Sequence, residues 1–551
     1  MSRVLAVLVA LILPFTLTTP ARAKDELVVA MTQYPATWNP VIGSMLAKSL
    51  IQSMTRRPFT AWDADWKLRC HLCVEVPTLE NGRARRVTLE GGKEGLEVDL
   101  EIQPAARWGD GVPVSVRDVA FTLEVGKHPL SGVASAEGYR RILAMKPHDD
   151  KRFTLTFDRV TFDYSNIDLQ LLPAHIDKPV FDADPAEYRN RNRFDTDSTN
   201  PGLAHGPYRF VQVVPGSQIV LERNPTWWGP TPHFRRIVVR IVESTAALEA
   251  NLLSGSVDYV LGELGLTLDQ GLLFEKRHGQ RFDVVHKPAL IYEHIDVNLD
   301  NPLLADRRVR QALLMAIDRE AISRTLFEGR QPVAHGGVSP LDPMFSPAAR
   351  QYRHDPAEAR RLLDAAGFSE LRAGVRHNAK GDRFSIELTT TAGNRVREQV
   401  AQVLQSQWRQ VGVELRIRAE PPRVFSQGLN RRAFSGLAMY AWVTRPQGVP
   451  RSTLHSGEIP SEANGWTGQN YPAYRNAEMD RVLDAMEREL DEGRRRALFA
   501  EMQRLHAEDL PVLPLFFRVD SFVIPKKLKG VVPTGHVNGS TLSVENWRWV
   551  D

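Results

Sequence analysis

The sequence has few cysteines, no apolar run of membrane-spanning length and no large excess of either charge. Two of its 551 residues are cysteines, and 70 Lys and Arg residues stand against 66 Asp and Glu residues. The apolar run from Val4 to Leu13 falls short of the roughly 20 residues that a transmembrane helix requires. No long basic run occurs, so we expect no nucleic-acid partner.

Signatures of hydrolytic enzymes are also missing. We find no convincing G-x-S-x-G, H-E-x-x-H or S-x-x-K site with its partner motifs. Acidic residues are plentiful, but nothing marks a catalytic carboxylate pair. We therefore expect no catalytic residues, and an exported hydrolase acting on peptides or glycans stays open as an alternative.

The two cysteines stand close together, in the segment Cys70-His71-Leu72-Cys73. A zinc site would need a second pair of ligands at matching spacing, and the sequence has none, so we expect no metal. In an oxidising compartment, a local disulfide that stiffens a turn is favoured over a redox-active pair.

The first 23 residues have the layout of a secretory signal peptide. Arg3 gives a positive start, the apolar run follows, and Ala21-Arg22-Ala23 forms a small-x-small cleavage site ahead of Lys24. No cysteine stands at that site, so a lipid anchor is not indicated. We expect cleavage after Ala23 and an exported, soluble protein; the alternative is a buried N-terminal helix.

Strand and helix patterns alternate along the chain, which indicates an α/β protein. Two or three lobes are expected, because single cores stop growing at roughly 300 residues. The apolar stretch Leu27–Ala30 and the alternating stretch Leu96–Ile102 predict strands. Ser115 and Asp118 have the spacing of a capping box at the start of a helix.

The second half contains the clearest helical patterns. Asp355-Pro356-x-Glu358 combines a cap, an N1 proline and an N3 carboxylate, and Gly367 ends that helix. Apolar residues recur at helical spacing in three further segments, which are Val309 to Ile317, Val396 to Val411 and Met479 to Leu490. These stripes predict helix faces buried in a core.

Seven segments of the mature chain resemble, in this order, the family 5 extracellular solute-binding proteins. That family comprises dipeptide, oligopeptide and nickel receptors of ATP-driven importers. The segments are Arg107-Trp108-Gly109-Asp110-Gly111-x-Pro113 with Arg117 to Phe121, Gly206-Pro207-Tyr208, Glu222 to Trp228, Asp306 to Arg319, Ala359 to Gly367, Tyr474-Arg475-Asn476 with Asp480, and Glu508 to Leu515. Each is weak alone, whereas seven in order behind a signal peptide are specific.

The resemblance implies a bilobal periplasmic-binding-protein fold of type II, in the large cluster with an extra subdomain. By analogy, domain I combines residues 24–55, 195–288 and 510–551, domain II is the insertion 56–194, and domain III covers 289–509. The chain then crosses between the lobes near Pro288 and Pro511, where we expect a hinge.

The resemblance also implies a periplasmic receptor of an ABC-type importer. Such a receptor captures a peptide or peptide-like solute between its lobes and delivers it to permease and ATPase subunits at the inner membrane. Closure distinguishes a loaded receptor only if the ligand binds the closed state better, so both lobes must contribute binding groups. No cofactor is implied, and a monomer is expected. An envelope sensor and a metallophore receptor with this fold are further alternatives.

Candidate ligand-binding residues lie in four segments, one of which runs from Trp442 to Arg445. Trp38 and Asn39 belong to a loop after the first predicted strand, and Tyr292 and His294 lie close to the predicted hinge. In the resemblance, a later stretch lines the domain III side of the cleft with aromatic planes and amides, which suit an extended polar ligand. Its candidate residues are His455, Trp466, Gln469 and Tyr471.

The segment Trp442-Val443-Thr444-Arg445 departs from the family pattern. Peptide-binding members resemble it with an aromatic residue, two further residues and then an Asp, which binds the free amine of the peptide. A guanidinium at that position repels an ammonium group, whereas it holds a carboxylate by two parallel hydrogen bonds. We therefore predict that Trp442, Thr444 and Arg445 contact a ligand with an acid, or with no free α-amine, at this point. The alternative is that Arg445 points to solvent or pairs with a nearby acidic side chain.

Overall fold

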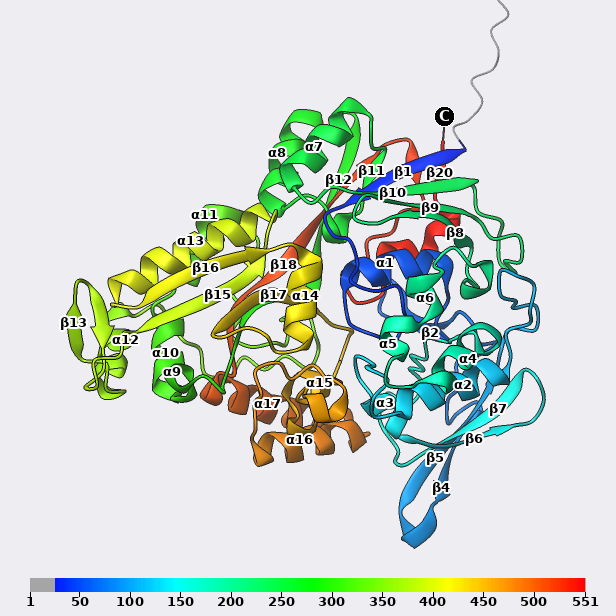
Figure 1. Ribbon diagram of the computed structural model, residues 1–551, viewed down its shortest axis with the longest axis horizontal. Coiled ribbons are helices and arrows are strands. Elements are labelled where there is room, and N and C mark those ends of the chain that lie inside the picture. Colours follow the sequence, from blue (N-terminus) through cyan, green and yellow to red (C-terminus); the bar gives the residue numbers. More distant parts are fainter. Residues whose placement is uncertain (1–24, 551) are drawn as a thin grey trace, which may run out of the picture.

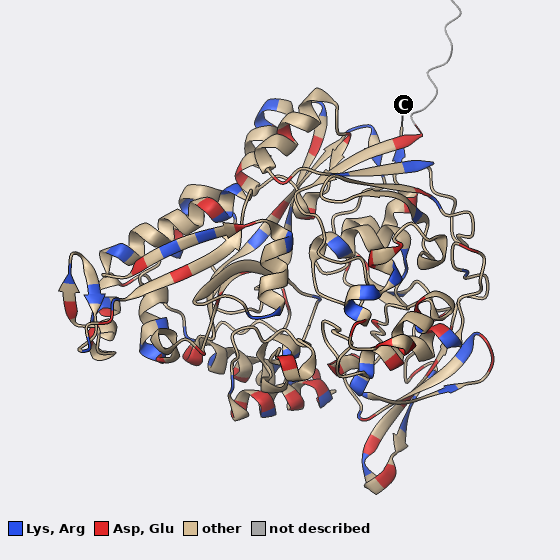
Figure 2. Ribbon diagram, viewed as in Figure 1, with Lys and Arg blue, Asp and Glu red and all other residues tan. Residues whose placement is uncertain are grey.

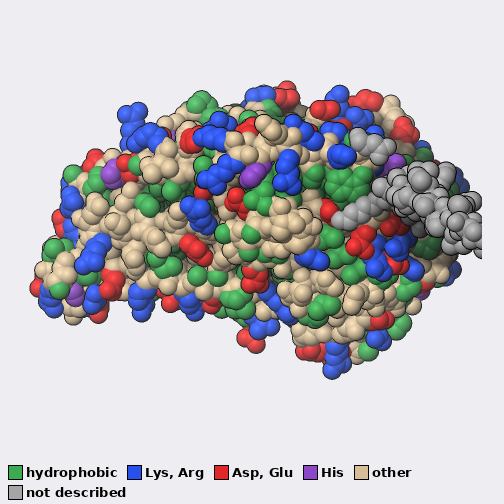
Figure 3. All heavy atoms as spheres, turned by 90° about the horizontal axis from the view of Figure 1, so that it is seen from above, with side chains coloured by type: hydrophobic (Ala, Val, Ile, Leu, Met, Phe, Trp, Pro, Cys, Tyr) green, Lys and Arg blue, Asp and Glu red, His purple; other side chains and the backbone are tan. Residues whose placement is uncertain are grey.

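The computed structural model describes residues 25–550 and shows two lobes joined by two long strands (Figure 1). The predicted signal peptide and its cleavage site lie outside the described residues. Among the residues described, no helix is both long enough and apolar enough to cross a bilayer. Acidic and basic residues are interspersed along the ribbons of both lobes (Figure 2), and their side chains are interspersed over the face turned to the viewer in Figure 3.

The first lobe is built around a five-stranded sheet. Its strands, in spatial order, are β11 (Tyr259–Val260), β1 (Glu26–Met31), β10 (Arg236–Ile241), β9 (Gln218–Arg223) and β8 (Tyr208–Val214). Successive side chains of a strand point in opposite directions. Leu27 and Val29 of β1 therefore enter a core that contains Trp547, whereas Val28 and Ala30 enter another core. Burial on both faces explains why the predicted strand Leu27–Ala30, now confirmed, is apolar throughout.

Helices cover this sheet. They are α1 (Leu46–Thr55), α7 (Thr245–Ser254) and α8 (Leu268–His278), with short 3-10 helices η2 (Pro201–Leu203), η3 (Gly262–Leu264) and η6 (Ser540–Asn546). A two-stranded sheet of β19 (Leu528–Lys529) and β20 (Arg548–Trp549) completes this part.

An antiparallel sheet is inserted into the first lobe between β1 and β8. Its strands, in spatial order, are β4 (Ala84–Thr88), β5 (Glu94–Glu101), β7 (Arg152–Phe157) and β6 (Ile142–Pro147). The alternating stretch predicted as a strand is β5, because Leu96, Val98 and Leu100 all enter one core. We call residues 56–194, which contain this sheet, the inserted subdomain.

The helices of the inserted subdomain include the predicted capping box. Ser115 Oγ accepts a hydrogen bond from the backbone N–H of Arg117, and the Asp118 carboxylate accepts one from the Ser115 N–H at 2.8 Å. The helices are α2 (Val116–Lys127), α3 (Glu137–Arg140), α4 (Ala174–Ala183), α5 (Tyr188–Arg191) and α6 (Arg193–Thr196), with η1 (Glu90–Gly92).

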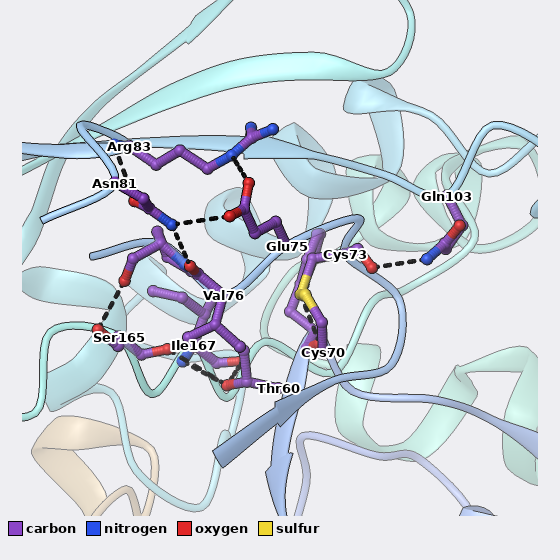
Figure 4. The surroundings of a disulfide bond; sticks show 12 residues. Thr60, Cys70, Cys73, Glu75, Val76, Asn81, Arg83, Gln103, Ser165 and Ile167 are labelled. Carbon is purple, nitrogen blue, oxygen red and sulfur yellow. Dashed lines mark hydrogen bonds and ion pairs between the residues drawn. A yellow bond between two sulfur atoms is a disulfide. The ribbon is translucent and has the colours of Figure 1, made fainter.

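A disulfide joins Cys70 and Cys73 in the inserted subdomain (Figure 4). Cys70 ends the short hairpin of β2 (Thr60–Trp62) and β3 (Leu68–Cys70). The Gln103 side chain donates a hydrogen bond to the carbonyl oxygen of Cys73 at 2.8 Å. The disulfide therefore fixes the turn that carries the chain from this hairpin toward β5.

The second lobe contains another five-stranded sheet. In spatial order its strands are β16 (Glu414–Glu420), β15 (Ser385–Thr391), β17 (Leu437–Val443), β12 (Phe282–Val297) and β18 (Val512–Pro525), with a small hairpin of β13 (Glu370–Arg372) and β14 (Val375–His377). Its helices are α9 (Pro302–Ala305), α10 (Arg307–Met315), α11 (Arg319–Phe327), α12 (Pro356–Ala365), α13 (Arg395–Gln410), α14 (Pro422–Asn430), α15 (Arg451–Leu454), α16 (Ala477–Arg488) and α17 (Glu492–Asp509), with η4 (Ser456–Glu458) and η5 (Glu462–Asn464).

The helices predicted in the second half are confirmed. Asp355 accepts a hydrogen bond from the Glu358 N–H at 2.9 Å and starts α12 as predicted. The predicted apolar stripes lie on α10, α13 and α16. Those of α10 and α13 face one core, and that of α16 faces a smaller core shared with α17.

β12 and β18 form the connection between the lobes. They pair from Phe282 opposite Pro525 to Asp296 opposite Val512, and the register shifts after Pro288. The predicted return of the chain near Pro511 differs from this arrangement, because β18 stays in the second-lobe core up to Val519. It reaches the first-lobe core only at Phe522.

Candidate ligand-binding cavity

A cavity of about 470 Å³ lies where the two lobes face each other. The first lobe contributes Met45 and Ser49 at the start of α1, and the inserted subdomain contributes Asp168. The second lobe supplies most of the wall, from β17, α14, α17 and the loop that contains Gly336 and Gly337. A ligand in this space touches both lobes.

The first-lobe wall is held in place by a buried lysine. Lys48 of α1 donates hydrogen bonds from Nζ to the carbonyl oxygens of Asn39, Ile42 and Gly43 at 2.7–2.8 Å. Burial lowers the pKa of Lys48 to about 7, against weak opposition from Asp195. These bonds fix the loop that leads into Met45.

Aromatic side chains form one side of the second-lobe wall. Trp442 and Tyr471 stack with their ring centroids 6.0 Å apart and their planes at 18°. Tyr440 meets Trp442 edge-on, because residues two apart in a strand share a face. Tyr292 of β12 lies directly opposite Trp442 in the antiparallel ladder, which brings the two predicted residues together. This surface offers flat apolar area beside hydroxyl groups.

Polar groups complete that wall. Thr444 donates hydrogen bonds from its backbone N–H and its Oγ1 to the carbonyl oxygen of Leu290, at 2.9 and 3.3 Å. Gln469 is held through its backbone N–H, which donates to Ser452. Both side chains line the cavity, so Thr444 and Gln469 place polar groups next to the aromatic wall.

Arg445 lines the same cavity and pairs with an acid of the opposite lobe. Its Nη2 forms an ion pair with Asp163 of the inserted subdomain. Burial raises the pKa of Asp163, but the charges of Arg445 and Arg141 outweigh it and hold that pKa below its ordinary value. Among the described residues, Nη1 of Arg445 has no hydrogen-bond partner. The ion pair therefore leaves one buried donor at the cavity.

Further charged contacts join the inserted subdomain to the second lobe. Glu487 of α16 pairs with Arg141, and Arg140 lies 3.3 Å from Glu458. The guanidinium of Arg495 stacks over the ring of Phe162 at 4.3 Å. We call this set of contacts, together with Arg445–Asp163, the inter-lobe face.

The sequence model of the bacterial extracellular solute-binding proteins, family 5 (Middle), matches residues 90–460, which is more than half of the chain. The chain belongs to this family. The oligopeptide-binding protein AppA of Bacillus subtilis is 24% identical over 533 residues, which cover 95% of this chain and 91% of that protein.

Solved structures agree with this assignment. The crystal structure of an oligopeptide binding protein from Thermus thermophilus, complexed with a pentapeptide, matches with a TM-score of 0.88 at 30% identity over 96% of both chains. The structure of AppA from Bacillus subtilis in complex with a nonapeptide matches with a TM-score of 0.85 at 23% identity, over 96% of this chain and 100% of that one. The predicted bilobal fold is confirmed, and the chain is a solute-binding receptor rather than an enzyme.

Two predicted residues of the receptor's first lobe lie away from the cavity. Asn39 is fully buried and donates a hydrogen bond to the Tyr188 hydroxyl at 3.2 Å. Trp38 packs edge-on against Tyr34 and Phe210 and borders a second, adjoining cavity of about 770 Å³. Asn39 therefore contributes to the packing of the first lobe. Trp38 borders the adjoining cavity and not the cavity of about 470 Å³.

Two predicted residues of the second lobe also lie outside the cavity wall. His455 caps η4, where its Nδ1 accepts a hydrogen bond from the Gly457 N–H at 3.0 Å. Trp466 has a left-handed backbone with φ of 63° and follows η5. His294, in contrast, is buried and lines the cavity, with Nδ1 3.0 Å from the Tyr292 carbonyl oxygen and Nε2 3.3 Å from Asp296.

Sequence reasoning missed several groups at the site. Asp163 is an unremarkable acid in the sequence, and His506 lies within a helix between charged residues. α14 also borders the cavity, although its apolar residues predict only packing. No local signal distinguishes these residues, because the fold brings them to the cavity from distant parts of the chain.

Proposed function

We propose that this receptor captures an oligopeptide or peptide-like solute in the periplasm and delivers it to the permease and ATPase subunits of an ABC importer. The observation that carries the proposal is a cavity lined by both lobes. A ligand that contacts both lobes stabilises their closed arrangement, which is what a permease must distinguish. The oligopeptide-binding names of the relatives support a peptide as the ligand.

The binding residues in this proposal are Tyr292, Trp442, Thr444, Arg445, Gln469 and Tyr471. Stacked aromatic rings and backbone-anchored polar groups suit an extended chain with varied side groups. At Arg445 the ligand presents a carbonyl or carboxylate oxygen to the free Nη1, and no free α-amine. A peptide with a blocked or modified amino end satisfies this requirement, as does a peptide-like acid.

The proposal also covers the organisation of the mature protein. Export with cleavage after Ala23 leaves a monomer with three domains, divided as in the sequence prediction except for the return crossing between Val519 and Phe522. The disulfide between Cys70 and Cys73 has a structural role in it, since neither residue lines the cavity.

Native mass spectrometry of the protein purified from the periplasm tests this function. We expect an intact peptide or peptide-like molecule to be retained, and calorimetry to show binding of synthetic peptides without their turnover. N-acetylated peptides should bind more tightly than the same peptides with free amines. Absence of binding across a broad peptide panel, or catalytic conversion of a peptide, would contradict the proposal.

A charge reversal tests the role of Arg445. We expect Arg445→Asp, made in an Asp163→Asn background so that two carboxylates do not face each other, to favour free-amine peptides over N-acetylated ones by about tenfold, since one charged hydrogen bond contributes about 1.5–3 kcal/mol. Arg416→Asp, on exposed β16 away from the cavity wall, is the matched control and should leave the preference unchanged.

A further inference from the structure

Four side chains of the second lobe that line the cavity carry a buried polar atom without a hydrogen-bond partner among the described residues: Tyr292, His294, Arg445 and His506. Arg445 is held by its ion pair with Asp163, and the His294 Nε2 lies 3.3 Å from Asp296. Among the described residues, the Tyr292 hydroxyl and the His506 Nδ1 have no hydrogen-bond partner. The two residues are only 6% and 4% exposed, and both line the cavity. Leaving a buried polar group without a partner is destabilising, so such groups gathered on one cavity wall point to a ligand.

Neighbouring hydroxyl groups on the same wall are satisfied by the protein. The Tyr440 hydroxyl donates to the Asp296 carboxylate at 2.6 Å, and the Tyr471 hydroxyl donates to the Asn430 side chain at 2.8 Å. The ring of Tyr292 stacks on His294 at 4.8 Å, and that imidazole contacts the backbone and Asp296. Tyr292 is therefore the tyrosine of these three whose hydroxyl is left to the cavity.

Open space lies beside both groups. A Cβ atom built on Gly336 would meet only one heavy atom within 4 Å, the His506 Nδ1 at 3.9 Å. A Cβ built on Gly337 would meet only the ring of Tyr292, at 3.6 and 3.7 Å. At these two glycines there is room for at least a methyl group next to Tyr292 and His506.

Charged groups of both signs surround this space. The Asp296 carboxylate lies close by, and the buried guanidinium of Arg319 is bonded to the carbonyl oxygens of Ala334, Tyr352 and Pro514. Burial, with a contribution from His294, lowers the pKa of His506 to about 4, so its imidazole is neutral near pH 7. The Nδ1 of a neutral imidazole donates or accepts one hydrogen bond according to the tautomer, and a phenol hydroxyl can both donate and accept.

We propose that Tyr292 and His506 form a subsite for an uncharged ligand group that both donates and accepts hydrogen bonds, of the carboxamide class found in Asn and Gln side chains. The subsite rests on the proposed function, because it selects one side group of the peptide or peptide-like solute. Gly336 and Gly337 supply its space. A site built around hydrogen bonds rejects an analogue that lacks them, since its own polar groups are then left unpaired.

A peptide scan by calorimetry tests the subsite. In a background peptide that binds, Gln, Glu and Met are placed in turn at every position; the three side chains have nearly equal length. We expect one position at which Gln binds at least tenfold more tightly than Met or Glu. Tyr292→Phe and His506→Leu should each reduce that preference about fivefold or more, and His506→Asn, which keeps a donor nitrogen, should restore part of it.

Further variants distinguish a loss of the subsite from a loss of folding. Gly336→Ala and Gly337→Ala place a methyl group in the subsite without backbone strain and should weaken Gln binding at the same position. Tyr259→Phe removes an equally buried hydroxyl from the first-lobe core, outside the cavity wall, and should change nothing. Peptides that bind wild type with no Gln preference, or a preference that survives Tyr292→Phe and His506→Leu, would overturn the subsite alone. Failure of every peptide to bind would instead refute the proposed function.

Discussion

The interior of each lobe and the inter-lobe face are built from different kinds of contact. The second-lobe core packs fully buried apolar side chains such as Leu313, Leu404 and Trp408. The inter-lobe face joins charged groups such as Arg445 and Asp163, which are partly exposed to water, and Glu487, which is buried. Apolar burial favours association in water at all ordinary salt concentrations, whereas exposed ion pairs contribute little and are screened. Each lobe should therefore stay folded while contact between the lobes forms and breaks.

Removing a core side chain should have the largest effect, because it lowers the free energy of unfolding of a lobe. Trp408 is fully buried on α13 and donates a hydrogen bond from its indole N–H to the Leu313 carbonyl oxygen at 2.9 Å. We expect Trp408→Ala to lower the free energy of unfolding by about 3–5 kcal/mol, measured by urea denaturation. Trp442→Ala, which removes a stacked ring from the cavity wall, should cost only about 1 kcal/mol. Equal losses would show that the wall is as tightly packed as the core.

Breaking one inter-lobe ion pair should affect lobe contact instead. Asp163→Asn leaves the charges of Arg445 and Arg141 without this carboxylate. We expect it to shift the unliganded protein toward a more open form by about 1–3 kcal/mol, because the pair is partly buried. The radius of gyration from X-ray scattering should rise, while urea unfolding of the lobes changes little. Asp182→Asn, which breaks an exposed pair with Lys178 inside the first lobe, should leave the radius unchanged.

The inter-lobe face should also respond to pH. Burial, opposed by Arg141 and reinforced by Glu137, raises the pKa of Glu487 from 4.5 to about 7. Because the buried carboxyl holds its proton more tightly when the lobes touch, contact is favoured at the acidic end of this range. It is lost as pH rises through about 7. We expect scattering to show expansion between pH 5 and pH 8, and Glu487→Gln to weaken this dependence. Expansion on acidification would contradict the sign.

Raising the salt concentration should have the smallest effect on contact between the lobes. Raising NaCl from 0.1 to 1 M shortens the Debye length from about 10 Å to about 3 Å. We expect this to weaken lobe contact in the unliganded protein by less than about 1 kcal/mol, seen as a small rise in the radius of gyration. The near-ultraviolet circular dichroism of the lobe cores should not change. A loss of that signal together with expansion would show that the lobes do not behave as rigid units.

Local features of the fold were predictable because neighbouring residues determine them. The capping box of Ser115 and Asp118 and the cap at Asp355 need only three or four consecutive residues. The return crossing lies further along β18 than Pro511, at the point where the polar residues Arg518, Asp520 and Ser521 separate two apolar stretches of the strand. Its place depends on packing against β12 and two separate cores, which a local pattern does not contain.

Part of the candidate site was predictable from a motif, and Tyr292 from the expected position of the hinge. The segment from Trp442 to Arg445 and the later residue Tyr471 were located through the resemblance, and all of these lie at the cavity. The partner of Arg445 was not, because Asp163 lies 282 residues away in the sequence. His506 was missed for a similar reason, since only the fold brings α17 next to the loop of Gly336.

The central claim is that the two lobes close over a peptide that touches both. Spin labels on cysteines introduced at Val214 of β8 and Leu371 of β13, two exposed positions in opposite lobes, measure this motion directly. The two native cysteines are joined and do not compete for label. Electron–electron resonance should show the label distance shorten and its distribution narrow when a binding peptide is added. An unchanged distance under conditions where calorimetry shows the peptide bound would contradict the account.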